Sequence, residues 1–145
     1  MPQIATDGNM QAREAMARSV LATLGRMDIE GLRAYLADDV VLELPFAPPG
    51  LGPKRVTGLD TVVATMARAP SVYESLAFTV IESYPIPSKD TVILRAMCDG
   101  ALKVGGRYTN EYMQLFTFRG RKVSVWIEFF DALRVVEMLS LLSSA

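Results

Sequence analysis

Apolar residues recur at steps of three and four through residues 9–27, a spacing that predicts a helix with one apolar stripe. Asp28 is suited to cap a second short helix over residues 29–36, and residues 59–68 predict a third. Between these helices, residues 45–53 hold four prolines and two glycines. Proline cannot donate to a helix or to a central strand, so this segment is predicted to be a loop.

After residue 70 the pattern changes to runs rich in β-branched and aromatic residues, each bounded by Pro, Gly, Ser or Asp. Long successive antiparallel strands are predicted at residues 76–86, 90–102, 106–118 and 121–131, with a hairpin turn at 119–122. A shorter strand is expected at 40–44, and a closing helix at 132–142. Helices followed by a strand meander indicate an α+β domain with helices on one face of a curved sheet.

Alternation along the last two strands brings polar groups onto aromatic faces. One face of strand 106–118 carries Tyr108, Asn110, Tyr112, Gln114, Phe116 and Phe118. In the last strand, Trp126, Glu128 and Phe130 share a face. The hairpin sets the two strands side by side, so we expect both faces to line one hollow. Rings with a few polar groups between them are typical of a pocket wall.

Glu128 needs a partner, because an unpaired buried carboxylate costs several kcal/mol. We expect Arg95, one strand further away, to reach toward it. One interpretation is a structural ion pair. The other is a carboxyl group whose pKa desolvation raises into a range useful for proton transfer. Leu44, Phe46 and Met97 complete the predicted pocket wall, and Phe46 belongs either to a lid or to a rigid corner of the proline-rich loop.

Composition narrows the possible functions. The chain has 145 residues, half of them apolar, and a net charge of −1 without a basic cluster, so one soluble domain (1–145) is expected and nucleic acid binding is not. The first eight residues are expected to form a flexible N-terminus. No apolar run predicts a membrane span or signal peptide, and a single cysteine favours the cytoplasm. Histidine is absent, which excludes Ser-His-Asp catalysis, and we expect neither a metal nor a cofactor.

Two long stretches resemble known domains. "DIEGLRAYLADDVVLELPFAPPG" with "VTGLDTVVATM" resembles the opening of nuclear-transport-factor-2-like domains of the SnoaL-like group. "RYTNEYMQLFTFRGRKVSVWIEFFDALRVVEML" resembles their closing hairpin, so the resemblance covers residues 9–142. It implies a cone-shaped, strongly curved, mostly antiparallel sheet of about six strands wrapped by three helices from the N-terminal half, plus a short C-terminal helix. It also implies a mostly apolar pocket and a homodimer.

The catalytic positions of the resembled ketosteroid isomerases are not retained. Their general base directly precedes the loop proline, where this chain has Leu44. Their oxyanion-hole tyrosine and acid would fall near Val20 and Gln114. Isomerisation by that mechanism is therefore not expected, although Gln114 retains a hydrogen-bond donor.

Two other members of the resembled group use an acid that Glu128 can match. In limonene-epoxide hydrolases an Asp-Arg-Asp set holds water; Arg95 would match the arginine, but Met97 replaces the second acid, with Asp99 a displaced substitute. Phenazine-biosynthesis A/B proteins carry a glutamate in the closing strand, which Glu128 matches. SnoaL-type cyclases use an aspartate, but we interpret Asp131 as the N-cap of the last helix.

The sequence thus favours a small-molecule enzyme that moves a proton in an isomerisation, cyclisation or hydration of an apolar or cyclic compound. Glu128 would be the general acid/base and Arg95 would orient the substrate, while Asn110, Tyr112 and Gln114 would donate to a substrate oxygen. The alternative is a non-catalytic protein that binds lipophilic ligands or serves as a dimeric accessory domain. Epoxide hydrolysis with an altered acid is a third possibility.

Overall fold

Six strands form one mixed sheet in the order β2-β1-β6-β5-β4-β3. The computed structural model describes residues 2–144, with side chains from residue 9 onward. The strands are β1 (Leu36–Glu43), β2 (Arg55–Thr57), β3 (Tyr73–Ile86), β4 (Thr91–Leu102), β5 (Arg107–Arg119) and β6 (Lys122–Phe130). The helices are α1 (Pro2–Gly25), α2 (Leu59–Met66), α3 (Ala69–Val72) and α4 (Ala132–Ser143), with 3-10 turns η1 (Glu30–Ala34) and η2 (Pro87–Lys89).

The four long strands predicted from the sequence form an antiparallel meander, β3 to β6. The predicted hairpin closes β5 onto β6 with Arg119 opposite Lys122. β1 then pairs with β6 in parallel, so the sheet is mixed and remains open at β2 and β3. Two features differ from the prediction: β1 begins at Leu36, and the short strand β2 follows the proline-rich loop.

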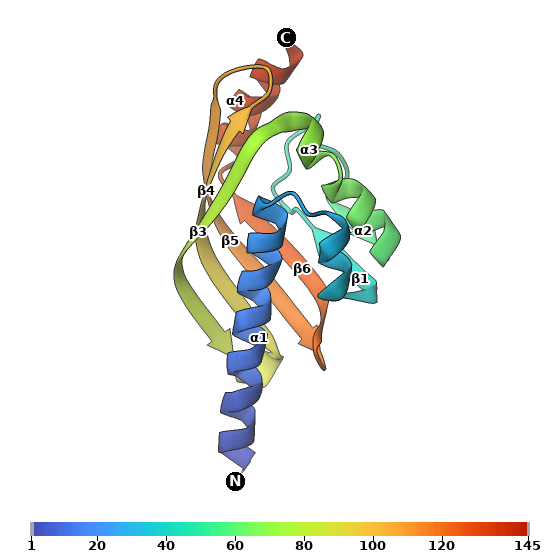
Figure 1. Cartoon of the computed structure of the whole chain (residues 1–145), viewed down its shortest axis with the longest axis vertical. Helices are drawn as coiled ribbons and strands as arrows, with labels where there is room; N and C mark the ends of the chain where they lie inside the picture. Colours follow the sequence, from blue (N-terminus) through green and yellow to red (C-terminus); the bar gives the residue numbers. More distant parts are fainter. Residues whose placement is uncertain (1, 145) are drawn as a thin grey trace.

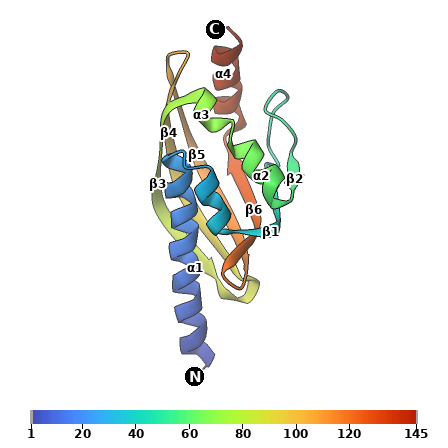
Figure 2. The same cartoon turned by 45° about the vertical axis from the view of Figure 1, so that its right-hand side comes forward.

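The helices cover the concave face of the sheet (Figures 1 and 2). α1 lies along β3 and β4, α2 lies near β1, α3 leads directly into β3, and α4 stands at the far end against β5. The apolar stripe predicted for α1 is buried at Val20 and Leu24, and the neighbouring Leu21 is buried as well. Residues 29–36 form the 3-10 turn η1 rather than a regular helix, with Leu32 buried. The predicted α+β class is confirmed.

Buried apolar side chains form two groups on the concave side. The larger lies beneath α1, η1 and α2 and includes Phe116 and Trp126, whose rings stack 5.6 Å apart. The smaller lies under α4 and includes Tyr108, Phe130 and Met138. Space left between the two groups forms the candidate site. The expected flexibility of residues 1–8 and the expected homodimer stay predictions.

Candidate functional site

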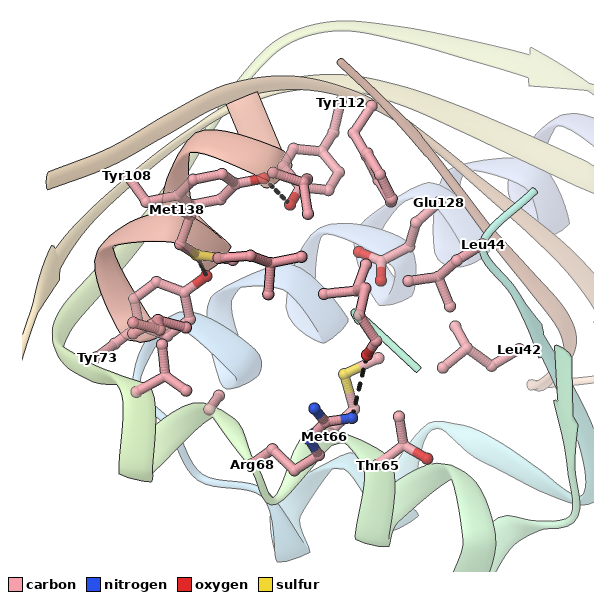
Figure 3. A pocket seen from close by; sticks show the side chains of 17 residues that line it. Leu42, Leu44, Thr65, Met66, Arg68, Tyr73, Tyr108, Tyr112, Glu128 and Met138 are labelled. Carbon is pink, nitrogen blue, oxygen red and sulfur yellow. Dashed lines mark hydrogen bonds between the residues drawn. The ribbon is translucent and has the colours of Figure 1, made fainter. Parts of the chain in front are cut away.

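A cavity of about 190 Å³ opens between the sheet, the proline-rich loop, α2–α3 and α4 (Figure 3). Its wall is mostly apolar. It is lined by Leu42, Leu44, Leu51, Thr65, Met66, Arg68, Ala69, Val72, Tyr73, Tyr108, Tyr112, Glu128, Phe130, Val135, Met138, Leu139 and Leu142. Glu128 is the only acid among these lining residues, so any acid–base chemistry in the cavity centres on it.

Glu128 lies on β6 with 7 % of its surface exposed, directly across from Gln114 of β5. Gln114 Nε2 donates to Glu128 Oε2 at 2.7 Å, and Gln114 Oε1 accepts from Trp126 Nε1 at 2.7 Å. Glu128 Oε1 has no hydrogen-bond partner among the residues the structure describes. Burial raises the pKa of Glu128 to about 7, although the bond from Gln114 acts in the opposite direction. Both protonation states are therefore accessible at neutral pH.

Two tyrosines supply the second polar feature of the wall. The hydroxyls of Tyr108 and Tyr112 lie 2.7 Å apart, and Asn110 Nδ2 donates to Tyr108 Oη at 2.7 Å (Figure 3 shows the tyrosine pair). With Asn110 donating to Tyr108 Oη, the Tyr108 hydroxyl can donate its hydrogen bond to Tyr112 Oη. Tyr112 then keeps a hydrogen for a ligand. Burial raises the pKa of both phenols, so they remain protonated donors.

Asn110 itself is fully engaged within the protein. Besides Tyr108, its amide donates to the Asp131 carbonyl at 3.0 Å and accepts from the Asp131 N–H at 3.1 Å. The Asp131 carboxylate accepts from Leu133 N at 3.0 Å, which confirms Asp131 as the N-cap of α4. The prediction that Asn110 donates to a substrate is therefore wrong: it joins β5 to the start of α4.

Arg95 and Met97 do not reach the cavity, contrary to prediction. Arg95 Nη1 lies 2.9 Å from Glu82 and Nη2 lies 2.7 Å from Glu111, both on the convex face. Met97 is 39 % exposed on that same face. Arg95 pairs with Met113 across the β4–β5 ladder, and residues directly opposite each other point to the same side of a sheet. The expected Arg95–Glu128 pair does not exist, and an arrangement like that of the epoxide hydrolases loses its arginine.

Gln114, Trp126 and Phe46 also take positions other than those predicted. Gln114 and Trp126 are completely buried behind the cavity wall and do not line the cavity. Trp126 donates a hydrogen bond to Gln114, and Gln114 in turn donates one to Glu128. Phe46 is 57 % exposed, with its ring 5.7 Å from that of Phe129, so it forms a corner of the loop and not a lid. The other predicted wall residues, Leu44, Tyr112 and Phe130, do line the cavity.

The wall opposite the sheet was missed by the sequence analysis. Four residues of α4 face the cavity at helical spacing: Val135, Met138, Leu139 and Leu142. That spacing predicts a buried stripe, and it was available in the sequence. Tyr73, at the start of β3, donates its hydroxyl proton to Met138 Sδ at 3.4 Å. Gly100 leaves room for the Tyr73 ring, since a Cβ there would lie 2.8 Å from it.

Replacing Gln114 with leucine is expected to lower the free energy of unfolding by about 2–3 kcal/mol. The change leaves the Trp126 N–H and one oxygen of Glu128 without partners in a dry environment. The control is Gln11→Leu on the exposed side of α1, which should change stability by less than about 0.5 kcal/mol. Urea unfolding of both variants measures the difference, and equal stabilities would contradict the structural role of Gln114.

The fold and site together define an α+β domain with an apolar, acid-containing pocket in a curved sheet. The model of the SnoaL-like domain matches residues 17–126, and the chain belongs to this family. No curated protein matches it significantly. Among the described residues, no helix is both long and apolar enough to cross a membrane.

Solved structures share the fold at low sequence identity. A provisionally assigned isomerase from Bacillus subtilis superposes with a TM-score of 0.82 at 24 % identity, covering 91 % of this chain and 96 % of that one. PrhC from Penicillium brasilianum gives 0.82 at 16 %, covering 94 % and 91 %. An LEH-like epoxide hydrolase from Mycobacterium tuberculosis gives 0.72 at 15 %, covering 90 % of each chain. At such identities the similarity establishes the fold alone.

Proposed function

We propose that the protein is a cofactor-independent enzyme that moves a proton on a small apolar, cyclic substrate, with Glu128 as the general acid/base. The observation that carries the proposal is the free Glu128 Oε1 in an apolar cavity, on a carboxyl group with a pKa of about 7. A general base is most effective when its pKa lies near the working pH. The reaction would be an isomerisation, a cyclisation or a hydration.

The chemistry follows from the two polar features of the wall. The ionised carboxylate takes a proton from a carbon next to a substrate carbonyl, and the neutral acid returns it at another position. Tyr112 donates a hydrogen bond to the substrate oxygen as negative charge develops there, with Tyr108 and Asn110 orienting its hydroxyl. Fixed donors in a site that excludes water are worth more than the same donors in water. Gln114 and Trp126 hold the carboxyl group in place.

A second candidate is a non-catalytic protein that binds lipophilic ligands. One observation favours it: the amides of Asn110 and Gln114, expected to contact a substrate, are engaged within the protein. Such a protein would bind apolar compounds without accelerating any proton transfer. Binding and proton transfer are therefore measured separately.

Deuterium exchange tests the proposal without knowledge of the natural substrate. The protein is incubated in deuterium oxide at pD 7 with 1-tetralone and 2-tetralone, two compact bicyclic ketones, and exchange beside the carbonyl is followed by proton NMR. We expect exchange above the buffer rate that saturates with ketone concentration. Saturable binding of the ketones without exchange would favour the second candidate.

A further inference from the structure

Arg68 is the one positively charged residue among the described residues that line the cavity. It follows α2 and directly precedes α3, on the side of the cavity facing the sheet. Figure 3 shows Arg68 and Glu128 extending toward the cavity from different walls, one from the helical segment and one from β6. Most of the other residues that line the cavity are apolar.

The guanidinium of Arg68 retains unused hydrogen-bonding capacity. Its Nη1 donates to the Leu51 carbonyl at 3.2 Å, and no carboxylate of the described residues lies within 4.0 Å of it. Guanidinium carries five N–H donors. Several arginines elsewhere in the fold are paired with carboxylates; Arg95, for example, lies between Glu82 and Glu111. Arg68 is exposed to solvent and presents a cation without a carboxylate partner at the edge of the apolar cavity.

The proline-rich loop fixes where this cation lies. The bond to Leu51 ties the guanidinium to the loop, and Gly52 passes close beside it. A Cβ on Gly52 would lie 3.2 Å from Arg68 Nη1, and the residue has φ +124°, a conformation that favours glycine. The loop backbone therefore both accepts one N–H of Arg68 and leaves room for the rest of the guanidinium group.

We infer that the cavity takes an apolar carboxylic acid, whose carboxylate binds Arg68 and whose hydrocarbon body fills the space toward Glu128. The planar guanidinium fork matches a carboxylate in geometry and charge, which makes this pairing stronger than a neutral hydrogen bond. The apolar wall between the two groups accommodates the hydrocarbon body. This inference rests on the proposed function, because it names the substrate class of the same cavity.

Calorimetric titration with 2-naphthoate and its neutral counterpart 2-naphthamide tests the inference. The titrations are made at pH 6, where Glu128 is mostly protonated and does not repel the anion. The wild-type protein should bind the acid about tenfold or more tightly than the amide. Arg68→Gln should lose this factor for the acid and change amide binding by less than about threefold. Arg68→Lys, which keeps the charge but not the fork, should fall in between.

Arg121→Gln is the matched control for net charge. Arg121 is exposed in the β5–β6 hairpin turn, at the end of the sheet opposite α4 (Figure 1), so its loss should leave both affinities unchanged. Three results would overturn the inference: no acid binding up to millimolar concentration, equal affinities of the wild type for acid and amide, or an unchanged acid preference in Arg68→Gln. The ketone exchange assay uses neutral ligands, so its failure would count against the proposed function and not against this inference.

Discussion

Glu128→Gln is expected to slow ketone exchange by about 100- to 10,000-fold, because a glutamine cannot take up or return a proton. The substitution preserves the shape of the side chain, and its amide oxygen can still accept from Gln114. Binding of the tetralones should therefore change little while exchange falls to the buffer rate. Comparing the saturation constant with the maximal rate separates these two effects.

The matched control is Glu43→Gln. Glu43 directly precedes Leu44 of the cavity wall, but its own carboxylate lies 3.9 Å from Arg55 and outside the cavity. Its replacement should leave the exchange rate within about twofold of the wild-type value. Equal rates for wild type, Glu43→Gln and Glu128→Gln would remove Glu128 from the mechanism.

The same substitution should stabilise the protein at alkaline pH. The pKa of Glu128 is raised from 4.5 to about 7 by burial. An unfolded chain releases this proton near pH 4.5, whereas the folded protein holds it until about pH 7. The contribution of this group to stability therefore falls as pH rises between these values and stays low above them. At about 1.4 kcal/mol per pKa unit, the total loss is about 3 kcal/mol.

Glutamine does not ionise, so Glu128→Gln avoids this loss. The variant should unfold with a free energy about equal to that of the wild type at pH 4, and about 3 kcal/mol greater at pH 8. Urea unfolding at the two pH values measures the difference, and Glu43→Gln should not reproduce it. A Glu128→Gln variant less stable than wild type at pH 8 would show that burial does not disfavour the ionised form of Glu128.

The alternation of side chains along the strands allowed much of the fold to be predicted. Successive side chains point to opposite faces of a sheet, so burying the aromatic face of β5 and β6 determines which residues point inward. This alternation placed Tyr112, Gln114 and Glu128 on the concave side, where the structure has them. Helix α1 and the strand meander were equally clear. The strand β2 is three residues long, too short to show a period of its own.

The site was predicted less well, because its partners depend on register between strands. Leu94, Gln114 and Glu128 lie in one row across three strands, which leaves Arg95 on the other side of the sheet. The sequence did not supply that register, so Gln114 was taken for a substrate ligand when it holds Glu128. Arg68 carried no local signal: its place at the cavity results from how α2, α3 and the loop pack.

Carbon-13 NMR of glutamate-labelled protein tests the central claim most directly, since it reports the protonation of Glu128 itself. The chain has eight glutamates, and their side-chain carboxyl carbons are followed from pH 3 to pH 9. One resonance should titrate with a midpoint of about 7 and be absent from Glu128→Gln. A Glu128 resonance that titrates between about pH 4 and 5, the range of a solvated glutamate, would contradict the account.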